Sequence, residues 1–102
     1  MARERTLLNA VTTNLTSAVV GWEGGAGLMI LSGVMDTVEV YVDCSFDGTN
    51  WAPLDGSPLT DAKAISFTAA PCTLRARTVG VGASTEVTLQ FDQIDQAGQG
   101  RL

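Results

Sequence analysis

Apolar and polar residues alternate one by one along this chain, and this alternation limits the possible folds more than any other feature. It is clearest over 37–46 and recurs over 62–68, 72–79 and 84–91. Successive side chains of a β-strand point to opposite faces, so this spacing gives each segment one apolar face for a core. No stretch carries apolar residues at helical spacing beyond one turn. The pattern predicts an all-β fold.

Seven short strands are predicted, at 6–12, 16–20, 26–32, 37–46, 62–68, 72–79 and 84–91. The side chains expected to face the core are Val38, Val40, Val42, Cys44, Phe46, Ile65, Phe67, Cys72, Leu74, Ala76, Val87, Leu89 and Phe91. Those expected to face outward on two of these strands are Glu39, Tyr41, Asp43, Ser45, Arg75 and Arg77. We expect the outward acids to pair across strands with the two arginines, as exposed pairs worth about 0–1 kcal/mol each.

Turn-forming residues separate these segments. The glycine-rich stretch 21–25 indicates a loop, Asp47-Gly48 a hairpin, 55–58 a turn, and Ala70-Pro71 a break. Strands and turns at this spacing predict a single-domain antiparallel β-sandwich or jelly-roll-like barrel over 6–94. Residues 1–5 are expected to form a flexible N-terminal arm, and residues 95–102 a flexible C-terminal tail.

The segment 26–32 breaks the alternation, because Leu28-Met29-Ile30-Leu31 is an unbroken apolar run. One face of this strand must meet the core. The other face is either covered within a central strand or is a contact between subunits. In the second case Met29 and Leu31 become candidates for binding a partner.

Charge and hydropathy exclude several partners. Arg3, Arg5 and Arg101 lie in the tails, whereas residues 6–100 hold three basic residues against ten acidic ones. Nucleic acid would repel so acidic a body. The longest apolar run is far shorter than a membrane span, and no secretory leader is recognisable at the start. We expect a protein made in the cytoplasm that binds neither nucleic acid nor membrane.

The residues needed for common catalytic chemistry are missing. The chain has no histidine and only two cysteines, Cys44 and Cys72, so histidine-activated nucleophiles and typical zinc sites are excluded. Both cysteines lie on inward phases and are expected to be buried and reduced, with a disulfide as the alternative. Glu39 and Asp43 would lie roughly 13 Å apart on one strand, and a glycosidase pair needs about 5–10 Å. We expect neither an enzyme nor a metal or cofactor site.

Three aromatic residues could serve binding. Trp22 lies in the glycine-rich stretch, Trp51 follows the Asp47-Gly48 turn, and Tyr41 lies on an outward phase. Exposed aromatic rings can stack on sugars or anchor a protein interface. For Trp51 we favour a ring that folds back over the edge of the core. For Trp22 both possibilities stay open.

The stretch Ser45-Phe46-Asp47-Gly48-Thr49-Asn50-Trp51 has the form S-x-D-G-x-x-W. Together with the pattern over 38–91, it resembles a hairpin of small β-rich phage structural proteins. It is also similar to the sialidase Asp-box, but one residue is missing after Asp47 and the stretch occurs once, so that reading fails. Neither resemblance implies a catalytic residue in this chain.

The phage resemblance implies a decoration or cement protein on the outside of a capsid, with a tail or fibre component as the alternative. It implies binding to the major capsid protein or other virion subunits, and self-association, with a trimer favoured. A carbohydrate-binding β-sandwich is the rival from another functional class. Arg3 and Arg5, with Leu7 and Leu8 of the first strand, are candidates for an arm that orders on a neighbouring subunit. The alternative is that residues 1–5 are a leader without a role.

Overall fold

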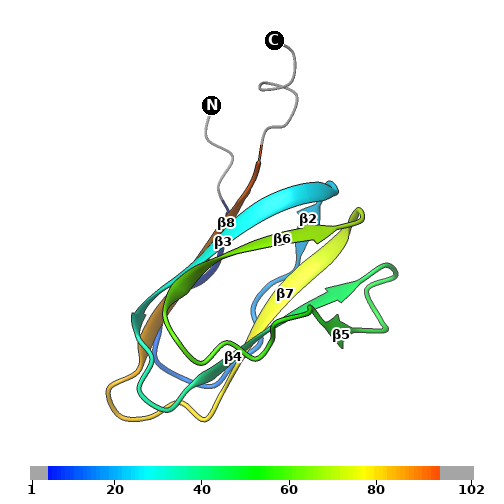
Figure 1. Ribbon diagram of the computed structural model, residues 1–102. Helices are drawn as coiled ribbons and strands as arrows, with labels where there is room; N and C mark the ends of the chain where they lie inside the picture. Colours follow the sequence, from blue (N-terminus) through cyan, green and yellow to red (C-terminus); the bar gives the residue numbers. More distant parts are fainter. Residues whose placement is uncertain (1–4, 95–102) are drawn as a thin grey trace.

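The computed structural model describes residues 5–94, and these form two four-stranded antiparallel sheets packed as a sandwich (Figure 1). The strands are β1 (Arg5–Val11), β2 (Val20–Trp22), β3 (Gly25–Val34), β4 (Glu39–Ser45), β5 (Ala52–Pro53), β6 (Lys63–Ala69), β7 (Cys72–Val79) and β8 (Glu86–Gln93). Sheet A has the order β1-β8-β3-β6, and sheet B has the order β2-β7-β4-β5. The all-β sandwich is therefore confirmed.

The described part of the chain contains no helix, and so none that is long and apolar enough to cross a membrane. The ends of the chain lie outside the described residues, and with them the expected C-terminal tail 95–102 and most of the expected arm 1–5.

The core lies between the sheets and is built from the inward phases of the strands. Alternate residues of β4, β7 and β8 are almost fully buried, as their spacing predicts. They are Val40, Val42, Leu74, Ala76, Val87, Leu89 and Phe91, and Val38 immediately before β4 continues the same buried phase. Ile65 and Phe67 of β6 are half-buried and pack against this cluster, also on the predicted face.

Two of the predicted elements near the N-terminus are wrong in position. The expected strand 16–20 is represented by a single bridge between Thr16 and Arg77, and the regular strand β2 covers 20–22. The expected loop 21–25 therefore begins with strand residues. Trp22 is only 5% exposed because its ring packs between the sheets, with its centroid 4.8 Å from Phe67 and 5.8 Å from Phe91. Its indole N–H donates to the Ala69 carbonyl at 3.3 Å.

A glycine makes room for this tryptophan. A Cβ added to Gly27 of β3 would lie 2.6 Å from Trp22 Cη2 and 2.7 Å from Phe67 Cζ. The burial of Trp22 therefore depends on a missing side chain on the neighbouring sheet. A pattern of local periodicity does not report this kind of fit.

The position of β3 in the middle of sheet A shows which residues of the apolar run 28–31 face the core and which face outward. Met29 and Leu31 face the core, and they are 4% and 1% exposed. Leu28 and Ile30 face outward and remain 38% and 45% exposed. No other layer of the described chain covers this outer face. The alternative in which β3 is covered on both sides is therefore wrong for residues 5–94.

Candidate functional site

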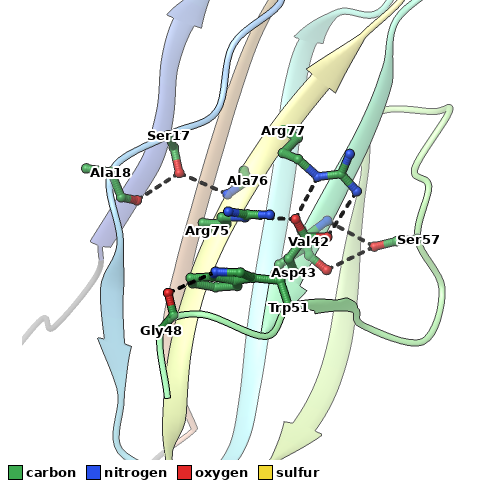
Figure 2. Close-up of polar contacts among 10 residues, drawn as sticks. All are labelled: Ser17, Ala18, Val42, Asp43, Gly48, Trp51, Ser57, Arg75, Ala76 and Arg77. Carbon is green, nitrogen blue, oxygen red and sulfur yellow. Dashed lines mark hydrogen bonds and ion pairs between the residues drawn. The ribbon is translucent and has the colours of Figure 1, made fainter. Parts of the chain in front are cut away.

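A connected group of polar and aromatic side chains lies on the outer face of sheet B. Strands β4 and β7 pair so that Tyr41 lies beside Arg77 and Asp43 beside Arg75. Trp51 joins them from the segment that follows β4. Figure 2 shows Asp43 between the two guanidinium groups, with the Trp51 ring next to Arg75. We call Tyr41, Arg77, Asp43, Arg75 and Trp51 the arginine–aromatic ladder.

The ladder is held by charge-assisted hydrogen bonds and by stacking. Arg77 donates from Nε and Nη2 to the two carboxylate oxygens of Asp43, at 2.6 and 3.2 Å. Arg75 Nε donates to Asp43 Oδ2 at 3.0 Å. The Arg75 guanidinium carbon lies 4.2 Å from the Trp51 ring centre, and that of Arg77 lies 4.6 Å from the Tyr41 ring. These distances suit cation–π contacts, worth about 0.5–1 kcal/mol each at exposed sites.

Asp43 is 1% exposed, and the expectation that it lies in an exposed ion pair is therefore wrong. It occupies an outward position of β4, but the side chains around it remove it from water. Glu39, the other predicted partner of the arginines, instead accepts a hydrogen bond from the Tyr41 hydroxyl at 3.4 Å. One carboxylate thus holds both guanidinium groups, and the pairing resembles a buried ion pair more than a surface one.

The protonation of Asp43 reflects these neighbours. Burial alone would raise the pKa of its carboxyl group, but hydrogen bonds from Arg77 and Arg75 and their positive charges lower that pKa below its ordinary value. The Asp43 hydrogen bond raises the pKa of Arg77 in turn. At neutral pH the Asp43 carboxylate is therefore ionised and the Arg77 guanidinium group is protonated.

Acid is expected to weaken the native fold through Asp43. In the unfolded chain an aspartate titrates near pH 3.9, and in the fold the pKa of Asp43 is lower. The unfolded state thus binds the proton first, so the stabilisation is complete above about pH 4 and is lost as the pH falls towards the folded pKa. We expect the stability difference between the wild type and Asp43→Asn to shrink between pH 7 and pH 2 in urea unfolding. A constant difference across that range would contradict the pairing.

The motif 45–51 forms a tight turn held by its own side chains. The Asp47 carboxylate accepts the backbone N–H groups of Thr49 and Asn50, both at 2.8 Å, and the Ser45 hydroxyl accepts the N–H of Gly48 at 2.8 Å. Hydrogen bonds from the backbone of Asn50 and Thr49 hold the pKa of Asp47 well below its usual range. Gly48 adopts φ +77°, which suits glycine. The predicted turn is confirmed.

This turn leaves Phe46 84% exposed, and its predicted inward position is therefore wrong. Strand β4 ends at Ser45, so the alternation of faces no longer applies to the next residue. The Trp51 indole donates to the Gly48 carbonyl at 3.2 Å, which ties the ladder to the same turn. The favoured expectation for Trp51, a ring folded back over the core edge, is replaced by a half-buried ring against Arg75 on the outer face. The sequence analysis did not identify Phe46 as a candidate binding residue. Its position immediately before the Asp47-Gly48 turn was the feature that could have indicated its exposure.

The structure places the other predicted partner-binding residues away from this site. Five of them are 8% exposed or less and belong to the core, where inward strand phases and the packing of Trp22 put them: Leu7, Leu8, Trp22, Met29 and Leu31. In this conformation their side chains are not presented to a partner. Leu7 and Leu8 are both buried although adjacent, because the register of β1 against β8 shifts between Thr6 and Leu8.

The two candidate arginines of the arm differ. Arg5 is the first residue of β1, where its guanidinium group donates to the Gly21 carbonyl and lies 3.6 Å from a Glu23 carboxylate oxygen. It is therefore held against the sandwich. Arg3 lies outside the described residues.

Cys44 and Cys72 are free thiols, so the alternative of a disulfide between them is wrong for this structure. Both are half-buried rather than fully buried, and they pack against the edge of the core. Burial raises the pKa of the Cys72 thiol, and the neighbouring Cys44 raises it further. The thiolate is the reactive form of a cysteine, so this raised pKa disfavours reactivity at Cys72.

Among residues 5–94, no three residues of the metal-binding types gather into a possible metal site. A small hollow beside Arg5, Trp22 and Phe91 has a volume of about 10 Å³, which is no more than a single water molecule needs. This hollow is therefore too small to enclose a substrate. No protein-family model, curated protein or solved structure matches this chain.

Proposed function

We propose that this protein is a non-enzymatic structural component of a phage virion that binds other protein subunits, and specifically a decoration or cement protein on the capsid exterior. The observation that carries the binding role is Phe46, exposed at 84% on a turn fixed by Asp47 and joined to the ladder. The virion setting rests on the resemblance of the 45–51 motif and of the pattern over 38–91.

The composition of this surface supports binding to protein. Aromatic residues and arginine dominate the energetics of protein interfaces. Here Asp43 and the two rings already hold both arginines in place, so less side-chain entropy is lost on association. A ligand of this kind that binds only the assembled shell stabilises it by mass action.

The aromatic rings proposed for the rival role, carbohydrate binding, are not available together on one surface. Trp22 is in the core, and Trp51 and Tyr41 each have an arginine over one face. These three rings therefore do not form the open stacking surface that a sugar needs. Retention on a glycan affinity gel would favour this rival over our proposal.

Capsid binding tests the proposal. We expect the purified protein to co-sediment with capsids of its own phage that lack it, and Phe46→Ser to weaken binding roughly 30-fold, since a hot-spot residue contributes about 2 kcal/mol. Val34→Ser is the matched control, because Val34 is 52% exposed on the other sheet. Wild-type protein absent from the particle in an electron-microscopy map would contradict the virion role. Equal binding by Phe46→Ser would contradict the assigned surface.

A further inference from the structure

The four sheet edges of the sandwich differ in how they are closed. In sheet B, the segment 15–17 covers β7 through bonds such as Ser17 N–H to the Ala76 carbonyl at 2.8 Å. The segment 52–59 covers β4, with Val40 and Leu59 exchanging backbone hydrogen bonds at 3.0 and 2.7 Å. Neither of these long strands therefore presents a free edge. The remaining long edges are β1 and β6 of sheet A.

Strand β1 is poorly suited to pair with a further strand. Its register against β8 shifts twice, between Thr6 and Leu8 and between Leu8 and Val11. Ala10 adopts φ +49°, a left-handed conformation that interrupts the extended backbone. Bulges and local twist of this kind protect an edge against further pairing.

Strand β6 has none of these protections. All seven of its residues pair with β3 in unbroken register, from Lys63 with Leu31 to Ala69 with Gly25. Within residues 5–94 no strand pairs with its other side. Its only charge is Lys63, at its first position. The strand thus presents a regular row of backbone N–H and C=O groups without strand partners in the described chain, which is a template for one more strand.

We propose that β6 pairs antiparallel with β6 of a second copy of this chain, across a two-fold axis at Ser66, so that two four-stranded sheets A become one eight-stranded sheet. This inference does not depend on the virion role. Seven residues on each side would form about six backbone hydrogen bonds. Contacts of this kind are self-complementary and close after two copies, so they give a dimer and not the trimer implied by the resemblance.

The side chains of β6 fit this register. With Ser66 on the axis, Ile65 lies opposite Phe67 of the second copy on the core-facing side, where both residues are half-buried. Lys63 lies opposite Ala69, and the two lysines are roughly 20 Å apart along the strands. No acidic residue lies in β6, so the net charge of −5 on each chain is not concentrated at the contact.

The outer face of sheet A supports the same partner. Leu28 and Ile30, two of the exposed apolar residues of β3, lie beside Ser66 and Ala64 of β6. In the dimer these small and apolar side chains lie at the centre of the eight-stranded sheet, whereas in the monomer they lie near the edge of sheet A. A second copy is thus the occupant that matches the edge in backbone pairing, charge and side-chain size.

Sedimentation of the full chain with charged variants at Ser66 tests this dimer. Ser66 is exposed, so a lysine there fits the monomer, but in the dimer the two lysines would face each other with Cβ atoms about 5 Å apart. We expect the wild type to sediment at twice 10.7 kDa at micromolar concentration, and Ser66→Lys and Ser66→Glu each to weaken dimerisation at least tenfold. Mixing the two variants in equal amounts should restore a dimer, because opposite charges then face each other.

Ser32→Lys is the matched control, since Ser32 is exposed on the outer face of β3 but not on the edge strand. It should leave the dimer intact, and circular dichroism should show the same fold in all variants. A monomeric or trimeric wild type, a dimer that persists in Ser66→Lys, or a mixture of Ser66→Lys and Ser66→Glu that stays monomeric would overturn the proposal. Loss of the dimer in Ser32→Lys would also overturn it, because it would place the contact on the face of the sheet.

Discussion

Replacing Asp43 with alanine is expected to lower the free energy of unfolding by about 3–5 kcal/mol, the cost of breaking a buried ion pair from one side. Asp43 is 1% exposed and is the shared acceptor for Arg75 and Arg77. Without it, two partly buried guanidinium groups would lie on the same face at alternate positions of β7, with no carboxylate between them. Repulsion between like charges would add to the loss of three hydrogen bonds.

Chemical denaturation at neutral pH measures this loss, and Glu39→Ala provides the control. Glu39 lies on the same strand and face, but among residues 5–94 the hydrogen bond of its side chain is a long one, from the Tyr41 hydroxyl at 3.4 Å. We expect Glu39→Ala to change stability by less than about 0.5 kcal/mol, as is usual for a surface substitution. If Asp43→Ala cost no more than this control, the ladder would be a set of ordinary surface charges.

The phases of the long strands could be predicted from sequence because a period of two is a local property. Residues 38–44 and 86–91 show their inward face through spacing alone, and the Asp47-Gly48 turn is equally local. For these elements the sequence carries nearly all the information that the fold uses.

The remainder depends on contacts between distant parts of the chain. Trp22 is buried because Gly27 and Phe67 leave room for its ring, and Asp43 is buried because Arg75 and Arg77, more than 30 residues later, close around it. Phe46 is exposed because β4 ends one residue before it. None of these outcomes follows from the periodicity of a single segment. As a result the candidate partner-binding residues chosen for apolar character proved to be core residues, while the residues of the site are polar or lie next to a turn.

Replacing Leu89 with alanine should destabilise the fold by about 2–5 kcal/mol. Leu89 is fully buried at the centre of β8, which pairs with β1 on one side and β3 on the other. Its neighbours across the strands, Leu8 and Leu31, are each 1% exposed and are fixed by the same sheet. They have little freedom to move into the space left by the missing side chain, so a cavity should remain. For a domain whose whole stability is of the order of 5–15 kcal/mol, this is a large fraction.

Leu28→Ala is the matched control because it removes the same atoms from a neighbouring strand of the same sheet. Leu28 faces outward and is 38% exposed, so in the monomer the substitution leaves no enclosed cavity and should cost less than about 1 kcal/mol. Urea unfolding of both variants, at a concentration where Ser66→Lys is monomeric and in that background, separates core packing from any contribution of the dimer. Comparable losses for the two leucines would show that β3 and β8 do not divide the apolar residues of sheet A into a buried and an exposed set. A large loss for Leu89→Ala alone would establish that division, on which both the core and the proposed dimer face depend.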